Sequence, residues 1–572
     1  MTHDPGAQIT SAGGLLGAAR RMRRRFGDRH TVGPDLGAGL VLGTEAVPDG
    51  LANGLLAGVN PVFGLYAYLI GLTVGSLSTS SALMSVESTS AMAVIIADVP
   101  AIADNPNDPA ILACLTLLTG LVLLVGGILR VGRLARFVSH AVLTGFVKAV
   151  AVSIILGQLD NLTGYDNSGS NKIAQFIDTV LNVSSFRWSG IAIGVATMVL
   201  IIGLQRTPIG PTGLVVAVVL TSAAVAVLDL SVVTLGDVTD VPRSLPTPTW
   251  PDFGAVSGLL VPALSLGFVS GLQGNMISAT VHNPDGRLAD PSGDLRGVGA
   301  ASLVSGAFGA LPVGGSMAGT SIVRSAGART RAANLIAGLT IAIVILAFSE
   351  LIAGVAMPAL GGLLVVIGVR ALKPHDVRFV WRTGRNGTIA MASTFVLTLV
   401  IPLQYAVLVG VALSILMSIV RQANRIVVVQ WVYDDDGARP IEVTPAKVVG
   451  PGEVVILMVH GNLFFAAAAT LEAQLPSVDS STRGSVVILR LRGQDSVGGT
   501  ALHAMRRYAA ALADTDSRLL LEGVGPNLHR QLVDTHTLNA VGFLEPRLAR
   551  PRIFDALEES RSDAAEWVAS HR

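Results

Sequence analysis

The chain has 572 residues and a net charge of +1, with 51% hydrophobic and only 14% charged residues. Soluble domains carry about a quarter charged residues, so this composition excludes an ordinary soluble protein. The balanced charge gives no indication of a nucleic-acid partner. The single cysteine, Cys114, lies in an apolar run, where we expect it to serve as a small core residue.

The first region, residues 1–30, ends in a basic run, RRMRRRFGDRH, at residues 20–30. A secretory signal would continue into a short apolar segment and a small-residue cleavage site. Neither follows this run. We therefore interpret residues 1–30 as a solvated basic arm.

Apolar segments dominate the chain from residue 31 to residue 422, and many approach the ~20 residues needed to cross a bilayer. The sequence thus predicts an α-helical transmembrane domain embedded in membrane lipid. We count fourteen spans, near residues 35–54, 61–78, 88–98, 110–129, 137–157, 189–205, 211–229, 257–280, 297–311, 319–326, 332–348, 350–371, 388–402 and 404–420.

Two of these spans, 88–98 and 319–326, are too short to cross the bilayer as complete helices. Irregular backbone at membrane depth is tolerated where it lines a cavity, and short segments at matching places in two halves indicate a binding site. Both are third in a set of seven, which predicts repeats at 31–235 and 254–422. Because seven is odd, two similar halves would have opposite orientations.

The Lys/Arg distribution predicts the orientation of the spans, because basic residues concentrate in cytoplasmic loops. If the basic arm is cytoplasmic, the loops after even-numbered spans are basic. They contain Arg130, Arg133, Arg136, Arg206, Arg287, Arg296, Arg329, Arg331, Lys373, Arg378, Arg382, Arg385, Arg421 and Arg425. We therefore expect a multi-pass protein of the inner membrane with both termini in the cytoplasm.

The last part of the chain returns to a soluble composition, with a linker at 423–450 that contains acidic residues 434–436. Strand-like runs at 453–460 and 485–491 alternate with helical spacing at 502–512 and around 528–538, which predicts an α/β domain over 451–558.

A polar glycine loop at residues 493–500 precedes the first of these helices. Strand–loop–helix openings bind phosphate through backbone N–H groups, but the Lys-Ser/Thr of a P-loop is missing here. Asp495 and Ser496 are therefore either regulatory residues or simple cap and turn residues.

Three carboxylates lie at membrane depth, where an ionisable group indicates a functional site. Glu45 and Asp49 are four residues apart on one helix face, so they repel one another, and a bound proton relieves the repulsion. Coupling-ion binding is one interpretation; a wet helix end or a pair with Lys148 is the other. Glu87 either caps its own half-helix or points into the cavity that the short segments line, where a bound anion would require its protonation or a nearby cation.

Several motifs together resemble the sulfate permease (SulP) family, whose members end in a STAS domain. They are DLGAGL at 35–40, GVNPVFGLY at 58–66, FVSHAVLTGF at 137–146, PVGGS at 312–316, SAGART at 325–330 and Asp495-Ser496-Val497-Gly498. The resemblance covers residues 31 to 555. It implies seven-plus-seven inverted repeats, core and gate domains, a homodimer, and an anion held between the half-helices of spans three and ten, near spans one and eight.

The resemblance places the substrate-binding positions around these half-helices, at Glu87, Ser88, Thr89, Gln273, Gly315, Ser316, Gly319 and Thr320. The hydroxyl groups are anion donors, although for Thr320 helix packing is an equal alternative. The coupling-ion candidates are Asp49, Glu45 and Glu87. The sequence departs from the family pattern at Asp49, where glutamine is common, at Gly319, where an arginine is customary, and at Ser270, which replaces an acidic residue.

We expect secondary active transport of a small anion (sulfate, bicarbonate or a dicarboxylate) by alternating access, coupled to H⁺ or Na⁺. We expect no enzymatic activity, cofactor or metal; His140, for example, has no partner at ligand spacing. The alternative is a membrane-held signalling platform whose STAS domain binds a cytoplasmic regulator. A nucleobase carrier of similar repeat architecture would lack the C-terminal domain.

Overall fold

The computed structural model describes residues 29–131, 139–165, 167, 172–208, 210–284, 286, 289–423, 426–433, 439–464 and 468–571. The chain divides into two compact units, Met1–Ser414 and Ile415–Arg572. Most of the predicted basic arm lies outside the described residues. So do Phe137, Val138, Arg133, Arg136, Arg287, Arg425 and the acidic residues 434–436.

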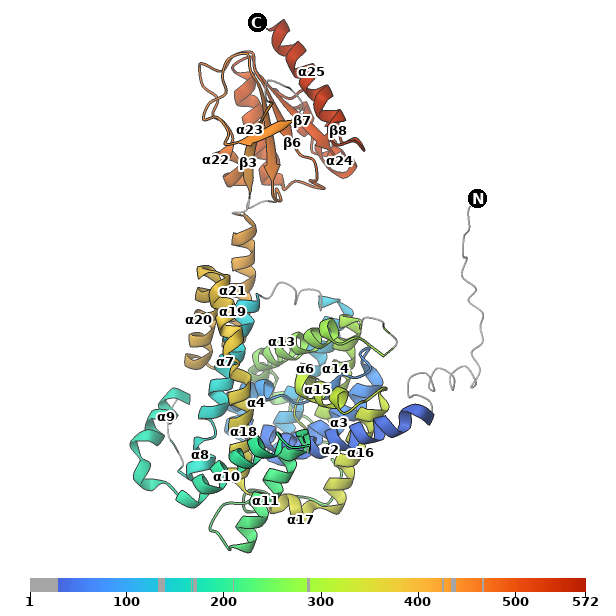
Figure 1. Ribbon diagram of the computed structural model, residues 1–572, viewed down its shortest axis with the longest axis vertical. Coiled ribbons are helices and arrows are strands. Elements are labelled where there is room, and N and C mark those ends of the chain that lie inside the picture. The colour runs from blue at the N-terminus through green and yellow to red at the C-terminus, as the bar shows by residue number, and fades with distance from the viewer. Residues whose placement is uncertain are drawn as a thin grey trace. The chain divides into compact units, whose positions relative to one another are not determined.

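The first unit is helical (Figure 1), and each predicted span overlaps at least one helix. These helices are α2 (Arg29–Leu56), α3 (Pro61–Ser78), α4 (Ser90–Ala97), α6 (Pro109–Ile128), α7 (His140–Leu156), α10 (Trp188–Leu204), α11 (Gly213–Val227), α13 (Val256–Thr280), α14 (Pro291–Ala307), α15 (Met317–Ser325), α16 (Ala332–Ala347), α18 (Met357–Leu372), α20 (Arg385–Val400) and α21 (Leu403–Ala423). Short helices connect them: α5 (Pro100–Ala103), α8 (Leu159–Thr163), α9 (Lys172–Leu181), α12 (Leu235–Val238), α17 (Ser349–Ala353) and α19 (Pro374–Thr383).

Five helical stretches in the described residues are long and apolar enough to cross a membrane, and several shorter helices are also apolar. The two predicted half-length spans are α4, with 8 residues, and α15, with 9 residues. At about 1.5 Å per residue, neither helix reaches halfway across a hydrocarbon core of about 30 Å.

The predicted continuous span at 350–371 is wrong, because the chain breaks between α17 and α18. Gly354 ends α17, and Pro358 lies in the first turn of α18. Glycine after a helix and proline at the start of the next are the usual residues at such a break. Two backbone groups freed at the break bind elsewhere: the Met357 N–H donates to Val233 O (3.0 Å) and the Ala356 N–H to the Ser222 hydroxyl (3.0 Å).

The helices pack in two groups that the two halves of the sequence build in the same way. In the core group, α2 packs against α3 and α16 as α13 packs against α14 and α6. In the gate group, α7 packs against α20 as α18 packs against α10, and α7 and α18 contact each other. Helix α11 joins the gate group through α10 and α18. Exchanging the halves therefore leaves the packing scheme unchanged, as inverted repeats require.

A short antiparallel strand pair, β1 (Ser85–Glu87) and β2 (Gly314–Ser316), lies directly before the half-helices α4 and α15. Ser85 pairs with Ser316 and Glu87 with Gly314, around the central pair Val86–Gly315. This register is symmetric, so the two repeats meet here across a local two-fold axis. Glu87 thus occupies the position in repeat one that Ser316 occupies in repeat two.

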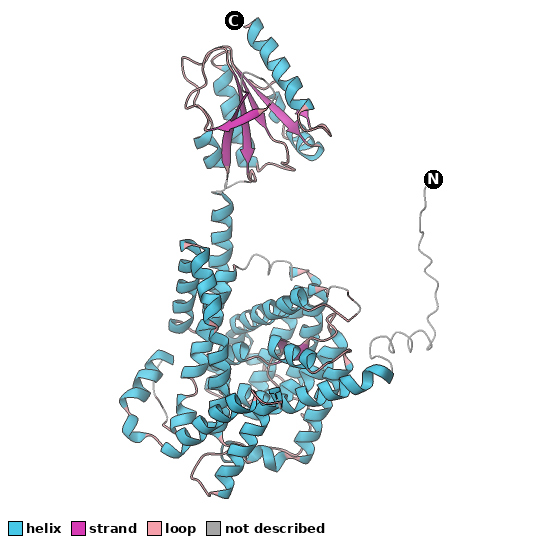
Figure 2. Cartoon of the chain, in the orientation of Figure 1, coloured by secondary structure: helices cyan, strands magenta, loops and turns pink. Residues whose placement is uncertain are grey.

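The second unit is an α/β domain (Figure 2) with a six-stranded sheet of order β4-β3-β5-β6-β7-β8. Its elements are β3 (Val427–Tyr433), β4 (Pro440–Val443), β5 (Val454–His460), α22 (Ala468–Gln474), β6 (Val486–Arg490), α23 (Gly499–Ala513), β7 (Arg518–Val524), α24 (Pro526–Asp534), β8 (Arg547–Leu548) and α25 (Asp555–Ser570). Strands β5 to β8 run parallel, while β3 is antiparallel to both β4 and β5.

The region predicted as a linker, 423–450, contains β3 and β4 of this sheet, and helix α25 extends past the predicted end at 558. The residues of β3, VVVQWVY, carry the β-branched and aromatic side chains that favour strands. Side chains alternate between the two sheet faces. Helices α22, α23 and α24 cover one face, and α25 covers the other.

Candidate functional site

A cavity of about 830 Å³ lies where core helices α2, α4, α13 and α15 face gate helices α7, α11 and α18. Six of the residues predicted from the sequence line it: Glu45, Asp49, Ser88, Thr89, Gln273 and Ser316. The other four, Glu87, Gly315, Gly319 and Thr320, are not among its lining residues. The half-helix region and the candidate coupling residues therefore share one cavity.

Helix α2 presents Glu45, Asp49 and Asn53 to this cavity. Residues four apart lie on one face of a helix, and Pro48 interrupts the backbone hydrogen bonds of α2 beside Asp49. The Tyr68 hydroxyl of α3 donates to the Asp49 carboxylate, and the Asn53 amide donates to the Tyr68 oxygen (2.7 Å) and to Ser88 O (3.4 Å). This chain of hydrogen bonds links span one to the start of α4.

The alternative that Lys148 pairs with Glu45 or Asp49 is wrong. Lys148 Nζ lies 2.9 Å from Asp376 Oδ2 and donates to Ala371 O at 2.8 Å, at the junction of α18 and α19. Among the described residues, no lysine or arginine forms an ion pair with Glu45 or Asp49. Carboxylates at membrane depth without a cationic partner are costly, and the assignment of a coupling ion to these two groups stays a prediction.

Glu87 does not cap its own half-helix, because the N-cap residue of α4 is Thr89. Its side chain, 3% exposed, instead contacts the Ser316 hydroxyl and the Gly319 N–H at the N-terminus of α15. A Cβ atom at Gly319 would lie 2.6 Å from Glu87 Oε1. Gly319, at the position of the customary arginine, thus leaves room for the Glu87 carboxyl group at the N-terminus of α15.

The N-terminus of α4 keeps hydrogen-bonding capacity for a ligand. Thr89 makes no side-chain cap bond to its own helix and donates to Gln273 Oε1 at 3.1 Å. The Ser88 hydroxyl is buried and has no hydrogen-bond partner among the described residues. Across the cavity, Ser316 accepts from the Gly319 N–H (3.1 Å) and caps α15. Hydroxyls and helix N-termini are the donors that bind anions without a fixed positive charge.

Two of the predicted residues, Thr320 and Gly315, make packing contacts, and so does Ser270. Thr320 accepts the Ser85 N–H at 3.0 Å and so positions β1, which supports the packing alternative for this residue. At Gly315 a Cβ atom would lie 3.0 Å from Gly274 Cα, so this glycine allows β2 to approach α13. Ser270, at the position of the family's acidic residue, is buried and donates to Val313 O (3.2 Å).

Among the cavity residues that sequence reasoning did not assign are Asn53, Tyr68, Arg370 and Lys373. Asn53 continues the four-residue spacing of Glu45 and Asp49, a signal present in the sequence. Tyr68 reaches the cavity through the packing of α3 on α2, for which the sequence has no local signal. Lys373 was interpreted only as a marker of orientation, and Arg370 was not singled out.

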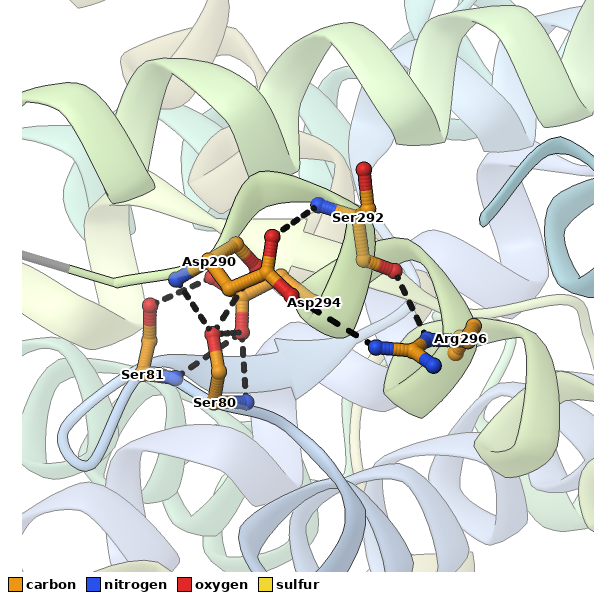
Figure 3. A network of polar contacts seen from close by, with 6 residues as sticks. All are labelled: Ser80, Ser81, Asp290, Ser292, Asp294 and Arg296. Atoms are coloured by element: carbon orange, nitrogen blue, oxygen red, sulfur yellow. Dashed lines mark hydrogen bonds and ion pairs between the residues drawn. The ribbon is translucent and has the colours of Figure 1, made fainter. Parts of the chain in front are cut away.

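Side chains of repeat two form hydrogen bonds with the segment between α3 and β1. Asp294, 1% exposed, accepts from the N–H and hydroxyl groups of Ser80 and Ser81 at 2.6–2.8 Å and from the Ser278 hydroxyl at 2.6 Å. Figure 3 shows this network at the start of α14. Arg331 donates to the carbonyls of Ser76, Thr79 and Ser80 at 2.6–2.9 Å. The contacts hold β1, and with it α4, to repeat two.

We expect Asp294→Asn to loosen this segment, because the amide N–H₂ group would face hydroxyl and N–H donors. Each buried polar group left without a partner costs about 1–3 kcal/mol, so the transmembrane unit should lose about 2–3 kcal/mol of stability. Thermal unfolding of the purified full-length protein measures the loss. Asp290→Asn, at an exposed cap of the same helix, is the matched control and should change stability by less than half as much; equal losses would contradict the assignment.

In the C-terminal domain, Asp495 accepts from the Asn527 amide at 2.9 Å, and Ser496 is exposed. The N-cap of α23 is Gly498, so the interpretation of Asp495 or Ser496 as the helix cap is wrong. Asp495 instead ties the loop to the first turn of α24. A regulatory role for the two residues stays a prediction.

Residues 33–394 match the model of the sulfate permease family, and residues 445–559 match that of the STAS domain. The chain belongs to the sulfate permease family. It is 28% identical to the probable sulfate transporter MT1781 of Mycobacterium tuberculosis, over 93% of this chain and 96% of that one. It is 23% identical to the bicarbonate transporter BicA of a Picosynechococcus strain, over 87% and 90% of the two chains.

The fold is similar to that of murine Slc26a9, an anion transporter solved in the inward-facing state. The TM-score is 0.81 at 18% identity, over 98% of this chain and 97% of that one. This likeness shows the fold alone: a helical membrane unit followed by a STAS domain. The predicted family and fold class are thereby confirmed, and the chain is a multi-pass membrane protein of an anion-transporter family.

Proposed function

We propose that this protein carries a small anion across the inner membrane by secondary active transport. Sulfate, bicarbonate and small dicarboxylates are the candidate substrates, and H⁺ or Na⁺ is the coupling ion. The observation that supports it best is the composition of the central cavity. One wall holds the N-termini of α4 and α15 with the hydroxyl groups of Thr89 and Ser316. The adjoining face of α2 holds Glu45 and Asp49, which form no ion pair with a described lysine or arginine.

An anion next to two carboxylates is electrostatically unfavourable unless positive charge enters with it. A proton on Asp49 or Glu45, or a sodium ion beside them, removes the repulsion and makes anion binding favourable. Binding of the two ions is therefore mutually dependent, as thermodynamic linkage requires. Glu87 adds to this dependence because its carboxylate competes with the substrate for the donors of α15.

The cavity extends to the basic ends of α10 and α18, where Gln205, Arg370 and Lys373 line it. The Lys/Arg distribution assigns this end to the cytoplasm. We therefore interpret this structure as the inward-open form. Alternating access would then require the core group to move against the gate group, with β1, β2, α4 and α15 carried as one body.

The test is uptake of radiolabelled sulfate, bicarbonate and dicarboxylates into proteoliposomes. Uptake is measured at two pH values, each with and without sodium. We expect uptake of at least one anion, stimulated either by an inward proton gradient or by sodium. Thermal unfolding shows whether the reconstituted protein is folded. If it is folded and transports none of the anions, the proposal is rejected.

We expect Thr89→Val to weaken substrate binding about fivefold, because it removes one hydroxyl hydrogen bond worth about 1 kcal/mol while it keeps the side-chain shape. The concentration dependence of uptake measures this effect. Thr73→Val, on α3 with its hydroxyl bonded to Leu69 O of its own helix, is the matched control. A KM unchanged by Thr89→Val would remove this residue from the substrate site.

The alternative of a signalling platform rested on the missing arginine of span ten. The close approach of Glu87 to Gly319 is a structural reason for a residue without a side chain at this position and supports the transport proposal. A homodimer and a cytoplasmic regulator of the STAS domain stay predictions. Truncation after residue 421 tests the regulator: loss of a partner with flux retained would favour a separate signalling role.

A further inference from the structure

A second cavity lies between gate helices α10 and α18 and adjoins the central cavity. It has a volume of about 400 Å³ and an apolar lining that ends at two arginines. We call it the α10–α18 groove. Its lining residues are Met198, Ile202, Gln205, Arg206, Val365, Val366, Val369 and Arg370.

The apolar wall of the groove opens on the outer surface of the helices. Ile202 is 44% exposed and Val369 is 54% exposed. On helices that cross a membrane, exposed aliphatic side chains of this kind contact acyl chains. The groove is therefore shaped and lined for a hydrocarbon chain that lies along the two helices.

The polar end of the groove carries positive charge without a balancing carboxylate. Arg206 follows the last turn of α10, is exposed, and forms no ion pair with the described residues. Arg370, in the last turn of α18, donates to the neutral Gln205 side chain. On the adjoining helix α19, the Asp376 carboxylate is bound by Lys148. Two guanidinium groups at the edge of an apolar groove match a phosphate group attached to acyl chains.

We propose that the α10–α18 groove binds an anionic phospholipid, with an acyl chain along the apolar wall and the phosphate between Arg206 and Arg370. Gln205 and Arg370 also line the central cavity. A bound headgroup thus reduces the positive charge at the basic end of the substrate route, and the anion flux depends on the lipid. The flux consequence rests on the proposed transport function, whereas lipid binding does not.

Native mass spectrometry of the full-length protein, with phosphatidylglycerol or phosphatidylcholine added, tests the binding. We expect preferential retention of phosphatidylglycerol, and an affinity about fivefold lower in Arg206→Gln, as for the loss of one cation near a lipid phosphate. Arg130→Gln is the matched control: it removes an exposed arginine at the same basic end, following α6 of the core group. Equal loss in both variants, or in neither, would overturn the site.

Val369→Trp tests the apolar part, because an indole fills the groove without changing charge. We expect retention of phosphatidylglycerol to fall while the stability of the protein is kept. A changed oligomeric state with lipid retention intact would assign the groove to a second copy of the chain and overturn the proposal. In liposomes, wild-type flux should change with phosphatidylglycerol content and Arg206→Gln flux should not. If the protein transports no anion, only this flux test fails. The mass-spectrometric binding measurements still test the lipid site.

Discussion

Replacing Asp49 by asparagine is expected to abolish proton-driven accumulation of the anion while exchange of anion for anion continues. Asp49 lines the central cavity and receives the Tyr68 hydroxyl, and no described cation pairs with it. Asparagine keeps the size of the side chain and stays neutral at every pH. The carrier would then bind its anion without a proton, and the proton gradient would no longer drive uptake.

The size of this effect follows from the gradient. With the membrane potential clamped at zero, each pH unit supplies about a tenfold accumulation per coupled proton. A gradient of two pH units should therefore give about 100-fold accumulation by the wild type and about none by Asp49→Asn. Radiolabelled uptake into proteoliposomes measures both, and counterflow measures the exchange that remains.

Two further variants make the result specific. Asp104→Asn changes an exposed carboxylate outside the cavity and should accumulate anion like the wild type. Glu45→Gln changes the other carboxylate on the same face of α2. If Glu45→Gln loses proton dependence and Asp49→Asn keeps it, the coupling role belongs to Glu45. If sodium drives uptake equally well in all variants, neither carboxylate carries the coupling ion.

Replacing Glu522 by leucine is expected to destabilise the C-terminal domain by about 3–5 kcal/mol, because it leaves a buried guanidinium group unpaired. Glu522 and Arg490 face each other on β7 and β6, with Oε2 and Nε 3.2 Å apart. They are 0% and 1% exposed. The Arg490 guanidinium also lies 4.7 Å from the centroid of the Trp431 ring and donates to Ile553 O at 2.9 Å.

Hydrogen exchange of the β6 and β7 amides in the full-length protein measures the loss. Protection should fall by two to three orders of magnitude, since about 1.4 kcal/mol corresponds to a factor of ten. The double variant Arg490→Met with Glu522→Leu removes both charges and should recover most of the protection, as buried ion pairs replaced by apolar residues often do. A double variant that is no better than the single one would show that the pair itself stabilises the domain.

The same pair has an expected pH dependence. Burial raises the pKa of Glu522 and lowers the pKa of Arg490. A carboxyl group whose pKa is raised on folding binds its proton more tightly in the folded domain than in the unfolded chain. The domain therefore loses stability as the pH rises from about 4.3, the ordinary pKa of a glutamate, through the pKa in the folded domain. The Glu522→Leu variant lacks this group, and the decline of stability across that window should be smaller in this variant than in the wild type.

The sequence by itself determined the elements that depend on local composition. Hydropathy predicted where the apolar helices lie along the chain. The short length of two apolar segments distinguished the half-helices α4 and α15 from the other spans. The four-residue spacing of Glu45 and Asp49 placed both carboxylates on one face of α2, and the structure turns that face toward the cavity. Each of these features is a property of consecutive residues, so a single stretch of sequence is enough to indicate it.

Only the tertiary structure decided which distant groups meet. Glu87 lies at the N-terminus of α15 rather than its own helix because β1 and β2 pair across the two repeats. Lys148 binds Asp376 because α7 packs against α19, and Tyr68 reaches Asp49 because α3 packs against α2. Partners of this kind are separated by many residues, and a side chain at membrane depth bonds to whichever group the packing brings near. The sequence therefore indicates the charge and length of each side chain, but not the group to which that side chain bonds.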